Sequence, residues 1–512
     1  MPADTVFTNA TALTMSAAQP WAGLVAVRGG EIAFVGESRD LGRVAGPGTR
    51  VIDCQGGVLL PGFIDAHMHL FSLVRALLGV DLAPPAVSSI EDIKSVIRRA
   101  AEKSPPGAWL TGAGYHEFYL AEHRSPNRRD LDEAAPENPV ILCHRGLHAC
   151  VLNSRALALA GITGETPDPP DGLIDRDLIT GEPNGILYEM LGYIREKVMP
   201  PLSRDDYDRG LARANERLLA YGVTSFHDAS VTNDFVRWRS FARSREEGRL
   251  KSRVYMMLAP GAAAQFREQG MATGSGDDGL RLGGVKIMLS EATGQVRPAG
   301  PELCALSTDL DRAGFQLAFH AVQRNTVQAA VRALEYIGRN VSARRHRIEH
   351  CSECPPGLLA RLERLRPVVV TQPPFLYYSG DRYLAMVPPE EHPWLYRFRS
   401  LMAAGLVVGG SSDSPVVPGN PLYGVYAAVT RQTEAGWPLL PHEAVDIGQA
   451  LAMYTVNAAY AASEEKRKGS IAPGKLADFV LLDGDPMKSP PEQIKELKVL
   501  MTVIGGRVVR EG

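Results

Sequence analysis

The sequence has few cysteines and no long apolar segment. Six cysteines in 512 residues are too sparse for a disulfide-stapled scaffold, so we expect reduced thiols. Cys351 and Cys354 form a CxxC motif, but no second pair completes a four-ligand zinc site. No apolar run reaches the ~18 to 20 residues that span a bilayer, and residues 1–10 lack the basic and apolar segments of a secretory signal. We therefore expect a cytoplasmic protein that does not associate with membranes.

Neither sign of charge is in large excess. Lys plus Arg number 55 and Asp plus Glu number 58, which gives a formal net charge of −3. A chain this close to neutral lacks the broad field that attracts nucleic acid or anionic lipid. Hydrophobic residues make up 45% of the chain, which excludes a disordered protein. The composition therefore predicts a globular protein with no nucleic-acid partner.

Both ends of the chain are rich in β-strand signals. Two β-rich runs flank Gly29-Gly30 near the N-terminus, and two more flank Gly505-Gly506 near the C-terminus. Such pairs around a Gly-Gly turn are typical of hairpins. We predict a small β-sandwich domain composed of residues 1–60 and 464–512.

Between these ends, apolar strands alternate with amphipathic helices such as Asn325–Gly338. Repeated strand–helix units favour an α/β fold, a closed TIM-like (β/α)8 barrel over residues 61–463, with a doubly wound open sheet as the alternative. The predicted barrel strands are Val58–Ile64, Thr224–His227, Val254–Leu258, Val285–Leu289, Gln316–His320, Arg347–His350, Val368–Thr371 and Leu406–Gly410.

A segment at about residues 80–213 is too long for one strand–helix unit. It is rich in turn signals such as Pro105-Pro106-Gly107, and it contains a strand signal at Val140–Cys143. We predict that it is an insertion with its own strands, which covers one end of the barrel.

The strongest local signal is a pair of histidines, His67 and His69, at the end of an apolar run. Residues two apart on a strand point to the same side, so both imidazoles can face one ion. The carboxyl ends of barrel strands are where TIM-barrel active sites lie. An isolated pair of this kind is more often two buried, hydrogen-bonded histidines.

The pair is not isolated, because other predicted strands also end in potential ligands. His320 and His350 each end a strand, and Asp413 follows another. Imidazole together with carboxylate suits Zn²⁺ and similar divalent ions. Lys286 lies inside an apolar strand, where a lysine is rarely buried without a partner. It either pairs with an acid such as Glu291 or is carboxylated by carbon dioxide, which makes it a ligand that can bridge two metals.

The order of these residues resembles the metal-dependent amidohydrolase superfamily. Two framing stretches, Gly62–His69 and Gly469–Val480, support the resemblance. Further stretches resemble the amidohydrolase family 3 branch that is typified by N-substituted formamide deformylase: Leu147–Ser154, Gly185–Glu189, Gly222–Asp228 and Tyr426–Arg431. The similarity extends from about residue 5 to residue 510.

The resemblance implies a metal-dependent hydrolase that cleaves a C–N bond of a small molecule, in an amide, N-formyl group, carbamate or cyclic amide. It implies one or two divalent ions, Zn²⁺ first, with Mn²⁺ or Fe²⁺ as alternatives. It also implies that Asp413 transfers the proton from the attacking water to the leaving nitrogen. The implied metal ligands are His67, His69, Lys286 in carboxylated form, His320, His350 and Asp413.

Weaker candidates lie outside the strand ends. His148 in the insertion is a candidate catalytic donor to the substrate carbonyl or its oxyanion. Tyr115 and Glu117 are candidates to line the pocket, because loop residues often carry specificity. Glu291 and Arg297 are further candidates for substrate binding, Arg297 through an anionic group.

Two rival functions stay open. The same metal site can cleave an ester, a lactone or a phosphotriester. Alternatively, the barrel is catalytically silent and serves as a binding scaffold. The resemblance also suggests a homodimer, since symmetric dimers are common.

Overall fold

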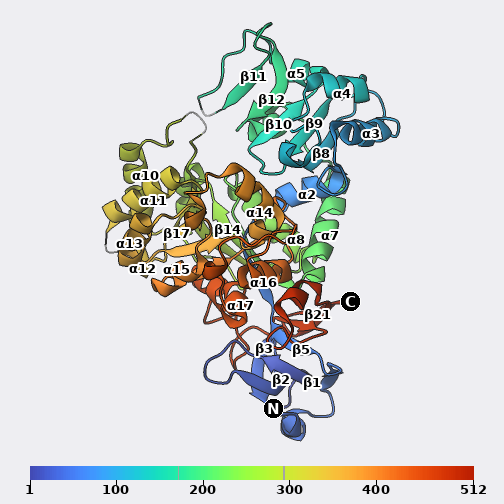
Figure 1. The fold of residues 1–512 in the computed structure, drawn as a ribbon. Helices are drawn as coiled ribbons and strands as arrows, with labels where there is room; N and C mark the ends of the chain where they lie inside the picture. The colour runs from blue at the N-terminus through green and yellow to red at the C-terminus, as the bar shows by residue number, and fades with distance from the viewer. Residues whose placement is uncertain (171, 292–293, 339) are drawn as a thin grey trace. The chain divides into compact units, whose positions relative to one another are not determined.

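The structure of the protein is a computed structural model that describes residues 1–170, 172–291, 294–338 and 340–512. The chain forms two compact units (Figure 1). Unit 1 contains Met1–His69, Asn215–Glu291 and Val296–Gly512, and unit 2 centres on Leu70–Ala214. Among the described residues, none of the helices has both the length and the apolar character that crossing a bilayer demands.

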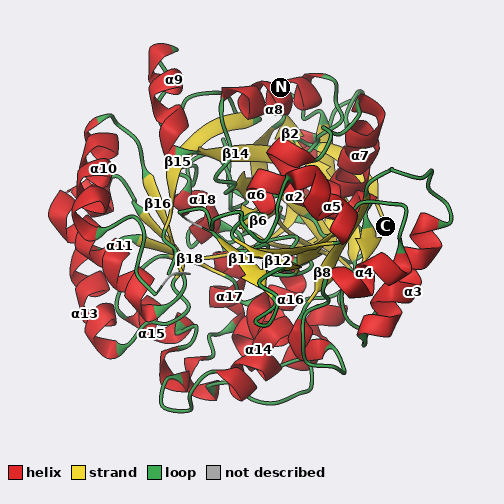
Figure 2. Ribbon diagram, turned by 90° about the horizontal axis from the view of Figure 1, so that it is seen from above, coloured by secondary structure: helices red, strands yellow, loops and turns green. Residues whose placement is uncertain are grey.

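Eight parallel strands in unit 1 form a barrel-like sheet (Figure 2). Each strand hydrogen-bonds to its neighbour in sequence, and the first and last strands, β6 and β19, contact each other. This arrangement confirms the predicted TIM-like barrel. The strands are β6 (Phe63–Met68), β13 (Val223–Asp228), β14 (Arg253–Leu258), β15 (Leu280–Met288), β16 (Leu317–Ala321), β17 (Arg347–His350), β18 (Val368–Thr371) and β19 (Val408–Gly410).

Helices follow the barrel strands, and α10 and α11 pack on β16 outside the sheet (Figure 2). Because both faces of the sheet are covered, every residue of β13, β14 and β17 is buried. The helices are α7 (Arg204–Ala220), α8 (Phe235–Glu246), α9 (Ala263–Glu268), α10 (Gly300–Arg312), α11 (Arg324–Ile337), α12 (Asn340–Ala343), α13 (Pro356–Leu365), α14 (Pro374–Met386), α15 (Phe398–Ala403), α16 (Pro421–Thr430), α17 (Ile447–Met453) and α18 (Val456–Ala461).

The predicted strand Val58–Ile64 is wrong as a single element. Val58–Pro61 is β5, which pairs with strands from both termini, and the barrel strand begins at Phe63. Gly62 separates the two, and a Cβ atom built there would lie 2.2 Å from Oγ1 of Thr224. A residue without a side chain is therefore needed where the chain passes from one sheet to the other.

The two chain ends share one sheet with the order β22-β21-β20-β5-β1-β2-β3, in which β4 also pairs with β1. In Figure 1 this sheet combines blue strands with red ones. Because the strands form one hydrogen-bonded sheet, the predicted sandwich of two sheets is not confirmed. The strands are β1 (Thr5–Leu13), β2 (Trp21–Arg28), β3 (Glu31–Gly36), β4 (Arg50–Asp53), β5 (Val58–Pro61), β20 (Phe479–Leu482), β21 (Val499–Ile504) and β22 (Arg507–Glu511).

Unit 2 has a sheet of its own, with the order β11-β12-β10-β9-β8-β7. The strand predicted at Val140–Cys143 is confirmed as β9. The strands are β7 (Val80–Asp81), β8 (Leu110–Tyr115), β9 (Val140–His144), β10 (Ala149–Leu152), β11 (Leu173–Arg176) and β12 (Pro183–Tyr188), and the main helices are α2 (Leu70–Leu78), α3 (Ile90–Ala101), α4 (Arg128–Ala134) and α5 (Ser154–Ala160).

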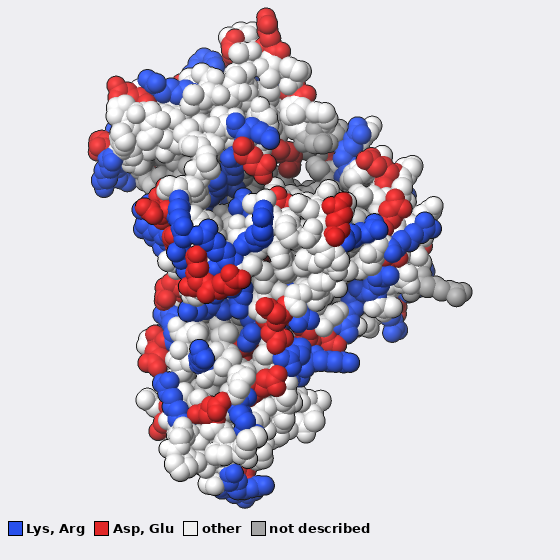
Figure 3. Space-filling view, turned by 180° about the vertical axis from the view of Figure 1, so that it is seen from behind, with Lys and Arg blue, Asp and Glu red and all other residues white. Residues whose placement is uncertain are grey.

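Charged side chains of both signs are intermixed on the face that Figure 3 shows. This agrees with the net charge of −3, because neither sign dominates a broad area of that face.

Candidate metal centre

The carboxyl ends of the barrel strands carry the predicted ligands of unit 1. Neighbouring strands pair in parallel, and the pairing places Met288 of β15 opposite His320, and Ala321 of β16 opposite His350. Strand ends therefore lie side by side. The predicted ligands are His67 on β6, His69 just after it, Lys286 on β15, His320 on β16, His350 at the end of β17, and Asp413 in the loop after β19.

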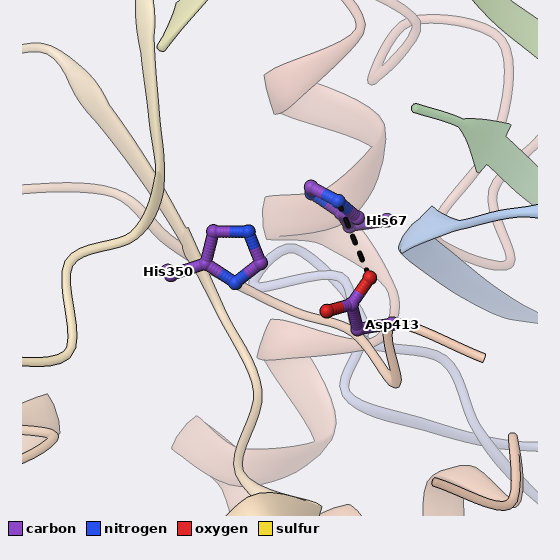
Figure 4. A group of neighbouring side chains, drawn as sticks. All are labelled: His67, His350 and Asp413. Atoms are coloured by element: carbon purple, nitrogen blue, oxygen red, sulfur yellow. Dashed lines mark ion pairs between the residues drawn. The ribbon is translucent and has the colours of Figure 1, made fainter. Parts of the chain in front are cut away.

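Three of these side chains converge and are buried: His67, His350 and Asp413 (Figure 4). One donor atom from each lies within 4.8 Å of the other two. Nε2 of His67 is 3.5 Å from Oδ1 of Asp413, the pair that the dashed line joins. Two imidazoles and one carboxylate form a donor set that suits Zn²⁺ and related divalent ions.

His69 and His320 border this group and are less buried. Nε2 of His69 lies 3.0 Å from Oδ1 of Asp413. The ring centroid of His320 is 4.5 Å from that of His350. The structure therefore brings all four predicted histidines to the same end of the barrel as Asp413.

Hydrogen bonds fix which ring nitrogen of two histidines faces the centre. Nδ1 of His67 is 2.5 Å from Oε2 of Glu349, and a carboxylate can only accept, so Nδ1 carries the proton. Nδ1 of His350 likewise donates to Oε1 of Gln372 at 2.8 Å. Each Nε2 then presents a lone pair, and that of His350 is buried with no hydrogen-bond partner among the described residues. Two imidazole nitrogens and a carboxylate oxygen that lie within 4.8 Å of one another fit a divalent cation.

The electrostatics of the pocket favour the metal-binding protonation states. Burial raises the pKa of the Asp413 carboxyl, but the hydrogen bond from His69 and the nearby imidazoles outweigh burial and hold that pKa below its usual range. Burial lowers the pKa of His350 to about 4. At neutral pH the carboxylate is therefore ionised and the imidazole is neutral, as metal ligation requires.

Lys286 is completely buried, and its Nζ lies 3.0 Å from Nε2 of His67. Burial lowers its pKa to about 8. Glu291, the alternative partner, instead accepts a hydrogen bond of 2.6 Å from Nδ2 of Asn325. Lys286 is thus directed at the ligand cluster and not at that acid.

Two proposed ligands have strained backbones. His350 and Asp413 have φ values of 71° and 58°, in the left-handed region that non-glycine residues rarely adopt. The backbone N–H of Asp413 donates to the carbonyl of His67 at 2.8 Å, which links the loop after β19 to β6. Strain of this kind clusters at functional sites, where the surrounding structure enforces it.

The other predicted site residues of unit 1 lie in the loop after β15. Glu291 is half-buried, and Arg297 is exposed. The backbones of Arg297 and Ser290 exchange two hydrogen bonds, of 2.8 and 3.1 Å, which close this loop.

Unit 2 contains the remaining candidates. Nδ1 of His148 is 2.9 Å from Oε1 of Glu189, which has a left-handed φ of 55°. Tyr115 is completely buried in the apolar core of the unit. Glu117 is partly exposed, and its Oε2 is 3.2 Å from Nε2 of His144.

His116, Glu117 and His144 form a second group with metal-ligand spacing. Nδ1 of His116 accepts the backbone N–H of Phe118 at 3.2 Å, and Nδ1 of His144 accepts that of Gly146 at 3.1 Å. A neutral imidazole that accepts at Nδ1 carries its proton on Nε2. The group therefore fits a cluster in which the protonated Nε2 of His144 faces the Glu117 carboxylate at 3.2 Å better than it fits a metal site.

Sequence reasoning missed the residues that hold the ligands in place. Glu349 and Gln372 orient His67 and His350, and Arg347 pairs with Glu349 through two hydrogen bonds of 2.7 and 2.9 Å. The available signal was Arg347 and Glu349 inside a predicted barrel strand, since buried charges need specific partners.

Comparisons with known proteins agree with this geometry. The model of a family described as "Amidohydrolase family" matches residues 50–510. The chain belongs to this family. It is 31% identical to an N-substituted formamide deformylase from Arthrobacter pascens, over 98% of this chain and 97% of that protein.

Solved structures give the same result. An uncharacterized metal-dependent hydrolase from Pyrococcus horikoshii OT3 matches with a TM-score of 0.76 and 26% identity, over 95% of this chain and 99% of that one. A second, from Pyrococcus furiosus, matches with a TM-score of 0.73, also at 26% identity, over 94% of this chain and 100% of that one. The protein is therefore a metal-dependent hydrolase of the amidohydrolase family that acts on carbon–nitrogen bonds.

Proposed function

We propose that the chain hydrolyses the C–N bond of an amide, an N-formyl group, a carbamate or a cyclic amide, with Zn²⁺ as its metal. The observation that carries the proposal is the buried convergence of His67, His350 and Asp413 at the carboxyl end of the barrel. A relative that covers nearly the whole chain is named as a deformylase of N-substituted formamides, which favours N-formyl compounds as the first substrates to test.

Six residues would hold the metal. His67, His69 and Asp413 would hold one ion, His320 and His350 would hold a second, and Lys286 in carboxylated form would be a further ligand. Carboxylation of Lys286 is supported by its burial and by its contact with an imidazole in place of an acid. A single ion with unmodified Lys286 is the simpler form of the same site.

The metal, when bound, lowers the pKa of a water molecule and polarises the substrate carbonyl. Asp413 accepts the proton of the attacking water and then donates it to the nitrogen, which leaves as the C–N bond breaks. The carboxylate is suited to this role because it is ionised at neutral pH and lies 3.0 Å from His69, which fixes its orientation.

His148 is proposed to stabilise the oxyanion that forms on the substrate carbonyl. Its Nδ1 lies 2.9 Å from Oε1 of Glu189, and this contact orients the ring. Substrate contacts are proposed for Glu117, Glu291 and Arg297, but not for Tyr115, which lies in the apolar core of unit 2.

The test combines metal analysis with a substrate panel. The purified protein should contain one or two equivalents of Zn²⁺ and lose activity on chelation, and Zn²⁺ or Mn²⁺ should restore it. His67→Ala should abolish turnover in a folded protein, and Asp413→Asn should lower kcat by about 10²- to 10⁴-fold. His442→Ala is the matched control, because His442 is exposed and lies in the short 3-10 helix Pro441–Glu443, outside the barrel strands.

Several outcomes contradict the proposal. Full activity of His67→Ala would remove the metal assignment. Turnover of esters, lactones or phosphotriesters without any turnover of amides would assign the site to that rival chemistry. A folded protein that binds metal but hydrolyses neither amides nor esters, lactones and phosphotriesters would support the role of a binding scaffold.

A further inference from the structure

A buried carboxylate contacts the side of His67 that faces away from the metal centre. Oε2 of Glu349 lies 2.5 Å from Nδ1 of His67, and both side chains are completely inaccessible to solvent. Among the described residues, the Glu349 carboxylate hydrogen-bonds to one predicted ligand, His67, so its direct contact with the centre is through this imidazole.

Arg347 holds Glu349 in place. Its Nε donates to Oε1 of Glu349 at 2.7 Å, and its Nη2 donates to Oε2 at 2.9 Å. Nη2 also donates to the carbonyl of Ala66 at 2.8 Å, and Nη1 lies 3.0 Å from Nδ1 of His227. Arg347 thus fastens the acid to β6 itself, directly before His67, and it balances the buried negative charge of Glu349.

We propose that Glu349, held by Arg347, is the positioning residue of His67: it keeps the proton on Nδ1, so that the lone pair of Nε2 always faces the metal. The proposal rests on the metal-dependent function proposed above and adds to it a residue outside the ligand set. A carboxylate behind a ligating histidine fixes the orientation of the ring and raises its basicity, and losing such a partner usually weakens metal binding 10- to 100-fold.

The chemistry of the glutamine side chain explains why Glu349→Gln should bind Zn²⁺ more weakly than the wild type. The amide offers one acceptor oxygen, whereas Arg347 and His67 together direct three N–H groups at this position. The NH₂ group of glutamine can instead donate to Nδ1 of His67, which moves the ring proton to Nε2. A proton on Nε2 occupies the lone pair that a metal needs.

The experiment measures Zn²⁺ affinity and the rate of Zn²⁺ loss to a chelator for the full-length wild type, Glu349→Gln and Glu349→Asp. The matched control is Glu443→Gln. Glu443 is also buried and hydrogen-bonded to an arginine, Arg397, but contacts no ligand histidine. Both glutamine variants should lose thermal stability, because each leaves an arginine without its acid.

The two variants should differ in metal binding. Glu349→Gln should lose 10- to 100-fold in Zn²⁺ affinity, Glu349→Asp should recover part of that loss, and Glu443→Gln should bind as the wild type does. Equal Zn²⁺ affinity and release in Glu349→Gln and wild type would overturn the positioning role and leave the proposed function intact. A wild type that binds no Zn²⁺ would overturn both.

A second measurement needs no variant at Glu349. In the NMR spectrum of ¹⁵N-histidine-labelled wild type freed of metal, the signals of His67 are those that are absent from the spectrum of His67→Gln. These signals should show a protonated Nδ1 and an unprotonated Nε2. A proton on Nε2 would refute the proposal even if Glu349→Gln fails to fold.

Discussion

The hydroxyl groups of two buried tyrosines, Tyr454 and Tyr255, should affect stability with opposite signs when they are removed. Tyr454 follows α17 and is 1% exposed, and its Oη has no hydrogen-bond partner among the residues that the structure describes. Tyr255 on β14 is completely buried, and its Oη donates to Oε1 of Gln316 at 2.7 Å. The perturbation is the same phenylalanine substitution at both positions.

The magnitudes follow from the two environments. A buried polar group without a partner costs about 1–3 kcal/mol, and the small void left by a hydroxyl costs roughly 0.3 kcal/mol. Tyr454→Phe should therefore stabilise the protein by about 1 kcal/mol. Tyr255→Phe should destabilise it by about 1–2 kcal/mol, because Oε1 of Gln316 then remains buried without this donor.

The assay is urea denaturation of both variants and of wild type, at one fixed metal concentration. For 512 residues that unfold as a unit, 1 kcal/mol shifts Tm by only about 1 °C, so the free energies of unfolding are compared from the denaturant midpoint and slope. If Tyr454→Phe lowers the midpoint as much as Tyr255→Phe does, the Tyr454 hydroxyl makes a stabilising hydrogen bond and the reasoning is refuted.

Three further predictions concern stability. Burial lowers the pKa of His346 to about 4, so between pH 6.5 and 4 the unfolded chain binds a proton that the folded chain does not. Acidification over this range should therefore lower the free energy of unfolding by up to about 3 kcal/mol. In His346→Gln, the urea midpoint should fall less steeply as the pH is lowered. Asp478→Asn should cost about 3–5 kcal/mol by calorimetry or denaturation, because Arg253, which donates to Asp478 at 2.6 and 2.9 Å, keeps a buried charge without its acid; an unchanged midpoint would contradict this. Gly62→Ala should destabilise by about 1–3 kcal/mol, since its Cβ would lie 2.2 Å from Oγ1 of Thr224, and Gly62→Ala with Thr224→Ala should regain part of the loss.

Local patterns predicted much of the fold because strands and helices leave periodic signals. The barrel strands at Val254–Leu258, Arg347–His350 and Val368–Thr371 agree with β14, β17 and β18 to within one residue at each end. The failure at Val58–Ile64 has a physical reason. A continuous apolar run carries no mark of the change of partners at Gly62, because β5 and β6 are both buried on both faces.

The candidate site was predictable only in part. Histidines and an aspartate at or just after strand ends pointed to the proposed ligands, and the structure brings them together because parallel strands place their carboxyl ends side by side whatever the sequence between them. Glu349 and Arg347 escaped this reasoning, because their partners, His67 and the carbonyl of Ala66, lie about 280 residues away along the chain.

The sequence alone determined the chemistry that is available to this protein: imidazoles, a carboxylate and a lysine, each at the end of a strand or within one. The tertiary structure decided which nitrogen of each imidazole faces the centre, which groups are buried, and which acid orients which histidine. Those properties depend on distances of a few ångströms between residues far apart in the chain, and they arise only when the barrel closes and excludes water from the pairs.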